Sequence, residues 1–554
     1  MACVASLLLT LTALLIYQAH ALGITVDEPS HLLSAHLYWK GQDNLKPQDM
    51  PPVIKIAGGW VSLFFDLPVP RDHPVWQRNH EWPIAAEMIQ KIPLQTLPAY
   101  VFWSRVPFVL FPAATVLLIW WWARQWVTPW AAMAAAAVYA FEPTALGHGA
   151  LFKNDLAAAF AYVLFSYCAW RYWREPGRRR VAWLGVSAAL GLCTKLSMVI
   201  LAPLSLVVIA GASAYRWRPL RNAALDALLC LAIATAIIGT AYQWKLRTWT
   251  VSEAEQLLAG TGLMTVLPVA SWFLAHIPAP GSLVEGVTSL LRDHGSPYRT
   301  WFWGELIPGG TRLYFLGAGA VKATLVFQLL LVVSLVLLFM RRMRGRFGEA
   351  AIFVLLPAAL YAGLASLSVL QLGYRLVLPA LALLALLTAF AIDELIQRQA
   401  RIPAIAAGIV LALHIAPCLM HYPNTMSYFN AWAGGPRHAL DYLSDSNVDW
   451  GQNLRALADY QNRNGIDILN VSYFGTDRLE RYFQPGRVNV IVPPWGSPAG
   501  KPERLRPRRG YYAISTTLLT GSLFDPRLRD YYKIFRDSEP DAYAGWSIYI
   551  YRVP

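Results

Sequence analysis

Apolar segments long enough to cross a lipid bilayer recur along almost the whole chain. A membrane-spanning helix needs about 20 residues that are predominantly apolar. The chain has 554 residues, of which 56% are hydrophobic and 14% are charged, whereas about 25% of the residues in a soluble domain are charged. The sequence therefore predicts a polytopic α-helical membrane protein. We predict eleven membrane segments, at residues 3–22, 98–123, 129–150, 155–173, 181–195, 198–214, 222–242, 313–340, 348–370, 375–394 and 402–420.

The basic residues lie mostly in the loops on one side of these segments. The short turns on the other side hold only Lys153, Lys195 and Arg375. An excess of positive charge marks cytoplasmic loops, so we predict a cytoplasmic N-terminus and an outer C-terminus. Because the net charge of +14 follows this topology, we do not expect nucleic-acid binding. The predicted cytoplasmic loops contain Arg124, Arg171, Arg174, Arg178, Arg179, Arg180, Arg216, Arg218, Arg221, Arg341, Arg342, Arg344, Arg346, Arg398 and Arg401.

The first apolar segment ends at Ala19-His20-Ala21, which resembles a signal-peptide cleavage site. A signal peptide also has a basic region before its apolar core, and no Lys or Arg precedes this segment. We therefore expect it to be a retained membrane helix.

Three long regions are predicted on the outer side of the membrane. Residues 23–97 form a first loop with two amphipathic helices, near 28–40 and 52–65. Residues 243–312 form a second loop, whose apolar stretch at 262–276 is expected on or in the membrane surface. Residues 421–554 are polar and rich in Tyr, and they predict a small α/β domain that follows the membrane domain of residues 1–420. Its expected elements are a helix at 449–463 and strands at 468–474, 488–492, 510–516 and 546–553.

Ionisable residues from distant parts of the sequence are predicted to meet on this outer side. Such groups are costly at membrane depth, so they usually face a cavity, pair with one another and mark function. The structural alternative for any one of them is an ion pair that joins helices, and Asp27 and Glu28 equally fit a solvated helix start. The predicted set is Asp27, Glu28, Glu142, His148, Asp155, Lys195, Glu305, Lys322 and Arg375.

Carboxylates and fixed cations around one cavity indicate a particular chemistry. A carboxylate accepts a proton from an attacking hydroxyl group, while Lys and Arg hold a phosphate and stabilise its developing charge. The sequence has no P-loop, no GxGxxG motif after a strand, no HExxH and no GxSxG. These absences argue against a nucleotide-driven enzyme, a zinc protease and a serine hydrolase. They favour a phosphate-bearing substrate that is reached from the membrane.

Several motifs resemble the bacterial branch of glycosyltransferase family 39, which has the GT-C fold and includes the protein O-mannosyltransferases and the aminoarabinose transferases of lipid A. The resemblance runs through most of the chain. It is carried by residues 26–28 (Val-Asp-Glu), 50–55 (Met-Pro-Pro-Val-Ile-Lys), 142–149 (Glu-Pro-Thr-Ala-Leu-Gly-His-Gly), 153–156 (Lys-Asn-Asp-Leu), 191–197 (Gly-Leu-Cys-Thr-Lys-Leu-Ser), 303–305 (Trp-Gly-Glu), 373–379 (Gly-Tyr-Arg-Leu-Val-Leu-Pro), 428–430 (Tyr-Phe-Asn) and 445–452 (Asp-Ser-Asn-Val-Asp-Trp-Gly-Gln).

The resemblance implies an inverting transfer of a hexose or pentose from a polyprenyl-phosphate carrier, such as undecaprenyl phosphate, to an acceptor hydroxyl on a lipid, glycan or protein. It implies a location in the bacterial inner membrane. By the same resemblance, Asp27 is the general base, Glu28 orients it or contacts the acceptor, and Asp155 shapes the site. Lys195, Lys322 and Arg375 bind the lipid phosphate.

Two motifs depart from the family pattern. Met50 stands where the family often has His or Asn, and the Lys153-Asn154-Asp155 sequence replaces Thr-Thr-Asp. These changes leave the exact donor and acceptor open. A transporter or flippase of lipid-linked saccharides would also need phosphate-binding cations, but the sequence shows no repeated halves of the kind that transporters often have. An inactive protein of the same fold is a further alternative.

The sequence leaves the use of a metal ion open. Asp27, Glu28 and Asp155 offer oxygen ligands for Mg²⁺ or Mn²⁺. The histidines of the first loop have no familiar zinc-site spacing, so we expect them at the surface or the membrane interface; they are His31, His36, His73 and His80. For Asp445, Asn447 and Asp449, a helix cap is expected rather than a Ca²⁺ site.

Overall fold

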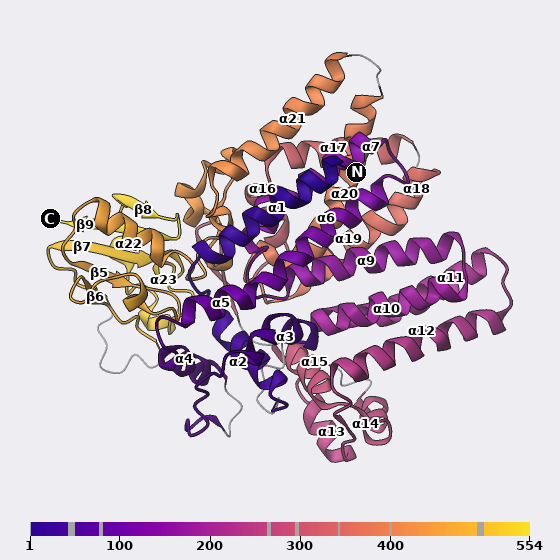
Figure 1. The fold of residues 1–554 in the computed structure, drawn as a ribbon, viewed down its shortest axis with the longest axis horizontal. Coiled ribbons are helices and arrows are strands. Elements are labelled where there is room, and N and C mark those ends of the chain that lie inside the picture. The colour runs from indigo at the N-terminus through magenta and orange to yellow at the C-terminus, as the bar shows by residue number, and fades with distance from the viewer. Residues whose placement is uncertain are drawn as a thin grey trace.

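The computed structural model describes residues 2–42, 50–76, 81–262, 267–293, 298–341, 344–397, 401–495 and 504–554. Most of the chain forms a helical bundle, and a smaller unit with a β-sheet lies at one end (Figure 1). The longer helices of the bundle are α1 (Ala2–Ala21), α5 (Leu97–Arg105), α6 (Leu110–Ala123), α7 (Pro129–Ala140), α9 (Asp155–Arg174), α10 (Arg178–Thr194), α11 (Leu201–Tyr215), α12 (Leu220–Ala241), α16 (Tyr314–Lys322), α17 (Leu325–Met340), α19 (Leu356–Leu367), α20 (Leu378–Ile396) and α21 (Arg401–Met420).

The lengths and composition of these helices define a multi-pass membrane protein. Among the described residues, six helical stretches are long and apolar enough to cross a membrane, and a seventh is added if α16 and α17, bent by 119°, count as one span. Each of the eleven predicted segments contains a helix, but their number as spans stays a prediction. Helix α7 has only 12 residues, about 18 Å at 1.5 Å per residue, and α9 and α10 carry charged residues near their ends.

Helix α20 forms the centre of the bundle. In its most apolar window 89% of the residues are buried, whereas 17% are buried in α12. Helices α7, α9 and α17 pack around α20, and its Ala and Leu side chains fill the space between them. The exposed apolar side chains of α12, such as Leu228 and Leu231, are suited to contact with lipid.

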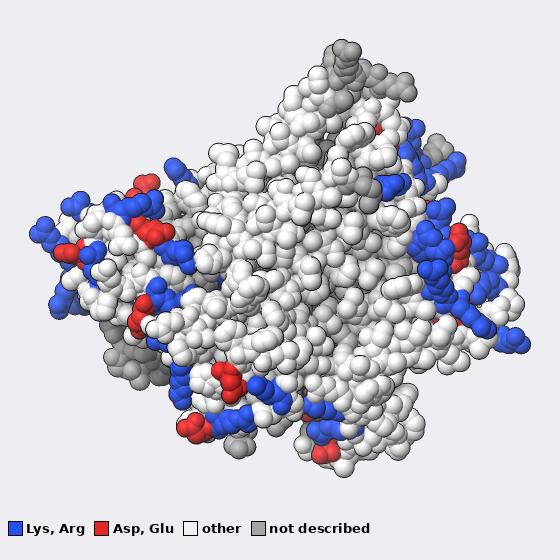
Figure 2. Space-filling model, viewed as in Figure 1, with Lys and Arg blue, Asp and Glu red and all other residues white. Residues whose placement is uncertain are grey.

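Charge is distributed unevenly over the surface. Figure 2 shows a wide zone without charged side chains between two charged ends, as expected of a protein with a membrane-embedded middle. Lys and Arg dominate the end formed by the α9–α10, α11–α12 and α17–α18 connections, where α18 is Arg346–Ala350. We call this the basic end. The other end, which holds the β-sheet, carries both signs of charge.

The first long loop forms α2 (Glu28–Trp39), α3 (Pro52–Gly59) and α4 (Glu81–Lys91). The prediction that the first of these helices is amphipathic was wrong. Every residue of α2 from Glu28 to Tyr38 is buried, because α3, α4 and neighbouring segments enclose it. His31 and His36 are therefore buried rather than exposed, and His80 lies outside the described residues.

Among its described residues, the second long loop contains three helices, one short hairpin (β3–β4) and two short antiparallel strands, β1 and β2, that are far apart in sequence. Helix α14 exposes Val269, Trp272 and Phe273, and its position on or in the membrane surface stays a prediction. The elements are β1 (Leu246–Arg247), α13 (Val251–Leu258), α14 (Leu267–His276), β2 (Ala279–Pro280), α15 (Gly281–Asp293), β3 (Arg299–Phe302) and β4 (Glu305–Pro308).

The C-terminal region forms the predicted mixture of strands and helices. Its five strands have the order β6-β5-β7-β9-β8, with β5 parallel to β6 and β7, and β9 antiparallel to β7 and β8. The short strand β8 was not predicted. The elements are α22 (Leu454–Arg463), β5 (Leu469–Ser472), β6 (Val488–Val490), β7 (Gly510–Ser515), α23 (Thr516–Leu519), α24 (Lys533–Arg536), β8 (Ala542–Ala544) and β9 (Ile548–Val553).

This region shares part of its core with the helical bundle. Leu22 and Leu151 of the bundle belong to the same apolar cluster as Met426, Trp450 and Ile514 of the C-terminal region. The division into domains at residue 420 therefore stays a prediction, and the contact surface between the two parts is where the candidate site lies.

Candidate active site

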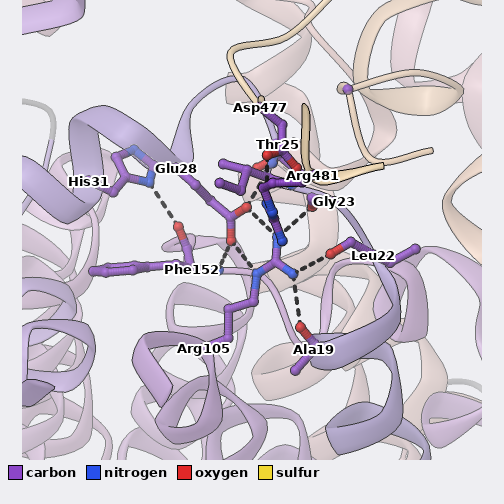
Figure 3. A network of polar contacts seen from close by, with 12 residues as sticks. Ala19, Leu22, Gly23, Thr25, Glu28, His31, Arg105, Phe152, Asp477 and Arg481 are labelled. Carbon is purple, nitrogen blue, oxygen red and sulfur yellow. Dashed lines mark hydrogen bonds and ion pairs between the residues drawn. The ribbon is translucent and has the colours of Figure 1, made fainter. Parts of the chain in front are cut away.

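A buried ion pair organises the segment that follows α1 (Figure 3). Arg105 at the end of α5 and Glu28 at the start of α2 are each 1% exposed. The Arg105 Nε and Nη2 atoms lie 2.7 and 2.5 Å from the two Glu28 carboxylate oxygens. Burial alone raises the pKa of Glu28, but the Arg105 charge and hydrogen bonds lower that pKa below its usual range. Both groups are therefore charged in a site from which water is excluded.

The same two side chains bind the backbone around them (Figure 3). Arg105 donates hydrogen bonds to the carbonyl groups of Ala19, Leu22 and Gly23 over 2.7–3.0 Å. Glu28 accepts from the amide groups of Thr25 at 2.8 Å and Phe152 at 3.0 Å. This network fixes the end of α1, the start of α2 and the turn before α9 in one place.

The C-terminal region also binds the segment after α1. The Gly23 amide donates to the Gln452 carbonyl at 2.8 Å, and the Val26 amide donates to the Trp450 carbonyl at 2.9 Å. The Ile24 amide donates to Asp477 Oδ2 at 2.9 Å. Residues 22–28 are thus held from both sides, and Asp27 lies in the middle of this fixed segment.

Asp27 forms an ion pair with Lys153, which lies two residues before the start of α9. The Lys153 Nζ atom also lies 3.3 Å from His31 Nε2. His31 Nδ1 donates to the Phe152 carbonyl at 2.8 Å, so its Nε2 atom is the acceptor for Lys153. The Asp27 side chain is 18% exposed, which leaves part of the carboxylate open to a ligand.

The surroundings of Asp27 keep its carboxylate ionised. Burial raises the pKa of Asp27, but the charges of Lys153 and Arg375 and the hydrogen bond from Lys153 lower it by more, and the net effect is a pKa below the usual range. Asp27 is therefore ready to accept a hydrogen bond or a proton at neutral pH.

A second cluster forms where α9 begins. Asp155 is fully buried, and its two oxygens accept from Lys195 Nζ at 2.6 Å and from Arg375 Nη1 at 2.8 Å. Helix α10 ends at Thr194, and Lys195 is extended before a 3₁₀ helix begins at Leu196. The predicted break between segments 181–195 and 198–214 is confirmed, and it directs Lys195 toward Asp155.

Trp450, from the C-terminal region, connects the two clusters. The Arg375 guanidinium lies 4.1 Å and the Lys153 ammonium 5.4 Å from the centroid of the Trp450 ring system. Cations at these distances are attracted by the negative face of an aromatic ring. Arg375 is also held by a hydrogen bond of 2.8 Å from its Nε to Ser446 Oγ. Gly373 has φ +154°, and a Cβ atom there would lie 2.3 Å from Ser446 Oγ, so the close approach of these two loops requires glycine.

Asp445 is a further carboxylate beside these clusters. Burial raises its pKa to about 6, with a further rise from the charge of Asp27 and an opposing effect of Arg375. Its φ of +57° is uncommon for a residue other than glycine, and such backbone is often found at functional sites. Asp445 also lines a cavity of about 240 Å³ together with Arg299, Tyr314 and Gln371.

Glu142 and Lys322 have backbone partners of their own. Glu142 begins α8 (Pro143–His148) and accepts from the Ala145 amide at 2.8 Å. The Lys322 ammonium is 1% exposed and donates to the Met426 and Asn447 carbonyls at 2.6 Å each. In this structure Lys322 joins two loops, and it has no open face for a phosphate.

His148 and Glu305 take two different positions. His148 is buried beside Trp450, with its ring centroid 5.8 Å from that of Trp450, so it lies directly behind the site. Its Nδ1 atom bonds to the Thr144 carbonyl within α8. Glu305 is exposed on the β3–β4 hairpin, and it lines another cavity with Arg529 and Lys533. The structure therefore does not bring Glu305 to Asp27.

No group of three metal-ligating side chains occurs among the described residues. Asp27, Glu28 and Asp155 each have a basic partner instead. The expected helix cap at Asp445, Asn447 and Asp449 was wrong, because α22 begins at Leu454 and Asn453 precedes it. Asn447 instead joins the Tyr374 amide to the Tyr314 hydroxyl.

The predicted set of site residues did not include four residues of the site: Arg105, Lys153, Asp445 and Trp450. Arg105 lies in a predicted membrane segment, where an ionisable residue should have drawn attention. Lys153 was noted as a basic residue of a short outer turn and as a departure from a family motif, but no role in the site was assigned to it. Trp450 and Asp445 come from the C-terminal region, and no local pattern indicated that this region completes the site.

The fold and the site thus define a multi-pass membrane protein with carboxylates and cations paired at one end of its bundle. Residues 83–244 match the family model for dolichyl-phosphate-mannose-protein mannosyltransferases. The resemblance to membrane glycosyltransferases is therefore confirmed over α4–α12, a stretch that includes Arg105, Lys153, Asp155 and Lys195. Asp27 and Arg375 lie outside it.

Two solved structures align with nearly the whole chain. They are ArnT from Cupriavidus metallidurans bound to undecaprenyl phosphate and the same protein in the apo state, with TM-scores of 0.43 and 0.44. Each is 12% identical, and each alignment covers 99% of this chain and 97% of the other. No match is found among curated proteins.

Replacing Glu28 by Gln is expected to destabilise the whole protein. The substitution leaves Arg105 as a buried charge without its counter-ion, which costs about 3–5 kcal/mol. We expect a clear fall in the thermal unfolding temperature of the detergent-purified protein. The exposed Glu255→Gln variant is the control and should unfold like the wild type. Equal unfolding temperatures of all three proteins would contradict the organising role of the pair.

Replacing Lys322 by Met tests whether this lysine is structural. The substitution leaves two buried carbonyl groups without a donor, each at a cost of about 1–3 kcal/mol. We expect a lower unfolding temperature, whereas the exposed Lys245→Met variant should be unchanged. If Lys322→Met kept wild-type stability but lost binding of a polyprenyl phosphate, Lys322 would be a phosphate ligand instead.

Proposed function

We propose that the protein is an inverting glycosyltransferase that moves a sugar from a polyprenyl-phosphate carrier to an acceptor hydroxyl. The observation that carries this proposal is the partly exposed Asp27 carboxylate, on which the charge of Arg375 acts, together with the Lys195 and Arg375 cations that share Asp155. The first group suits a base and the other two suit a phosphate. The family match over residues 83–244 supports the same class of reaction.

Asp27 acts as the general base in this proposal. It accepts the proton of the acceptor hydroxyl, and the acceptor oxygen attacks the anomeric carbon of the sugar from the face opposite the phosphate. A new carbon–oxygen bond forms while the bond from the anomeric carbon to the phosphate oxygen breaks. The electron pair of that bond leaves with the polyprenyl phosphate. For this step the Asp27–Lys153 ion pair opens when the acceptor binds.

Lys195 and Arg375 hold the phosphate as its charge increases. Arg375 uses Nη1 for Asp155 and Nε for Ser446, and within the described part of the chain no hydrogen bond from Nη2 is found. That nitrogen is available to a phosphate oxygen. Lys195 is 15% exposed, so its remaining N–H groups are accessible as well. Asp155 is a positioning residue that keeps both cations in place.

The substrates are proposed to reach the site from the end that holds the β-sheet. The cavity at Asp445 and Arg299 is suited to polar groups of a sugar or acceptor. With the basic end in the cytoplasm, this site faces the outer side of a bacterial inner membrane, with the N-terminus inside and the C-terminus outside. The sugar is a hexose or pentose, and undecaprenyl phosphate is the proposed carrier.

Asp445 is a second candidate for the base, because its pKa of about 6 is closer to neutrality than that of Asp27. A general base works best when its pKa is near the working pH. The transfer rate is expected to depend on pH differently with Asp27 or with Asp445 as the base, so its pH dependence distinguishes the two residues.

The first test is transfer by the purified protein with a panel of polyprenyl-phosphate sugars and envelope extracts as acceptors. We expect Asp27→Asn to reduce the transfer rate about 100-fold or more, since general-base catalysis contributes about 10²–10⁴-fold. The exposed Asp72→Asn variant should keep wild-type activity. Equal rates for Asp27→Asn and the wild type would remove Asp27 as the base. Movement of the lipid-linked sugar across proteoliposomes, without transfer, would indicate a transporter.

The second test is the pH dependence of transfer. Because the pKa of Asp27 is lowered, the carboxylate stays ionised throughout, and we expect no change in kcat/KM between pH 5 and 7 from this group. A rise of the rate with pH centred near 6, which disappears in Asp445→Asn, would assign the base to Asp445.

A further inference from the structure

A second cavity lies at the basic end of the bundle, far from Asp27. It has a volume of about 610 Å³ and is lined by residues of α6, α9 and α10. Arg171 in this cavity lies 16 residues after Asp155 on the same helix, which corresponds to about 24 Å along the helix axis. The cavity is therefore separate from the candidate active site, and nothing in the proposed reaction uses it.

The helical spacing explains why these side chains meet. Leu164, Tyr167 and Arg171 are three and four residues apart and lie on one face of α9. Arg179 and Trp183 are four residues apart on α10, as are Trp121 and Gln125 on the α6 side. Helices α6 and α10 both pack against α9, so the three faces line one space.

The arginines that line the cavity outnumber the carboxylate groups that pair with them. Arg171, Arg179 and Arg180 line it, and only Arg180 has a carboxylate partner among the described residues, the exposed Glu175. Other arginines at this end pair with an acid, such as Arg346 with Asp393. Figure 2 shows blue side chains gathered over this end of the molecule. Arg171 and Arg179 are thus available to an external anion.

The rest of the lining is aromatic and apolar. The Trp121 and Trp183 side chains are 49% and 52% exposed, and Leu164 and Tyr167 continue the apolar wall along α9. Trp and Tyr are typical of the boundary between lipid chains and headgroups. The cavity therefore places guanidinium groups next to an apolar surface. It lies at the basic end, where the zone without charged side chains ends.

We infer that this cavity binds an anionic phospholipid. The guanidinium groups of Arg171 and Arg179 bind the lipid phosphate, for which their paired N–H groups are well suited. The acyl chains lie against Trp121, Leu164 and Trp183. Basic pockets between membrane helices bind the headgroups of anionic lipids. The volume of this cavity is in the range of sites that bind small molecules.

The test is lipid binding by the full-length protein in neutral detergent, measured by native mass spectrometry. The probes are phosphatidylglycerol, phosphatidylcholine with the same acyl chains, and inorganic phosphate. We expect retained phosphatidylglycerol and little phosphatidylcholine or phosphate. The double variant R171Q/R179Q should bind phosphatidylglycerol at least about ten-fold more weakly, because each basic residue contributes to binding of anionic lipid.

The control is R178Q/R221Q, which removes two exposed charges from the same end but none from the cavity lining. It should keep wild-type binding. Equal losses in the two double variants would show general charge attraction and overturn the site. Equal binding of phosphatidylglycerol and phosphatidylcholine, or binding of inorganic phosphate as tight as that of the lipid, would also overturn it. Unfolding temperatures of both variants identify any loss that reflects misfolding.

Discussion

The buried Arg105–Glu28 ion pair is the interaction on which the candidate site depends. A charge pair that is 1% exposed on both sides is stable only if nearly every donor and acceptor is satisfied. Here the remaining donors of Arg105 bind three carbonyl groups, and the Glu28 oxygens bind two amides. The backbone at the end of α1 is thereby held next to the start of α9. Asp27 and Lys153 meet because their neighbours in sequence are part of this network.

The site combines carboxylates of two kinds. Glu28 and Asp155 are buried and surrounded by cations, so they position other groups. Asp27 and Asp445 are only partly enclosed, and their environments move their pKa values in opposite directions. Pairs of acids whose pKa values are moved apart are typical of catalytic sites. The ring of Trp450, from the C-terminal region, contacts the Lys153 and Arg375 cations of the bundle. The C-terminal region is therefore part of the site, as the bundle is.

The two ends of the bundle differ in the way their cations are used. At the end with the β-sheet, Arg105, Lys153, Lys195 and Arg375 each have a carboxylate partner. At the basic end, Arg171 and Arg179 have none among the described residues. A cation that is paired with a carboxylate stabilises the local structure, and it binds a ligand only through a free N–H group or after the carboxylate is displaced. An unpaired cation attracts anions directly. This contrast separates the proposed catalytic centre from the proposed lipid site.

Local patterns in the sequence were sufficient to place helices in all the predicted membrane segments, the break between segments 181–195 and 198–214, and most strands of the C-terminal sheet. These patterns are local: they involve runs of apolar residues, helix-ending positions and short alternating segments. Each depends on a few neighbouring residues, so it is visible in the sequence. The same reasoning predicted that Asp27, Asp155, Lys195 and Arg375 lie on one side of the membrane. The sequence did not show that Lys322 and Glu305, which belong to the same predicted set, would have other partners in the structure.

Only the tertiary structure decided which of these residues touch. Arg105 pairs with Glu28 across 77 residues, and Arg375 pairs with Asp155 across 220. Such contacts depend on how helices pack, and packing is determined by the shapes of many side chains at once. The buried position of α2 and the contribution of Trp450 follow from the same cause. The sequence by itself determined most of the helices and strands and predicted that these ionisable residues lie on one side of the membrane, and long-range packing determined their partners.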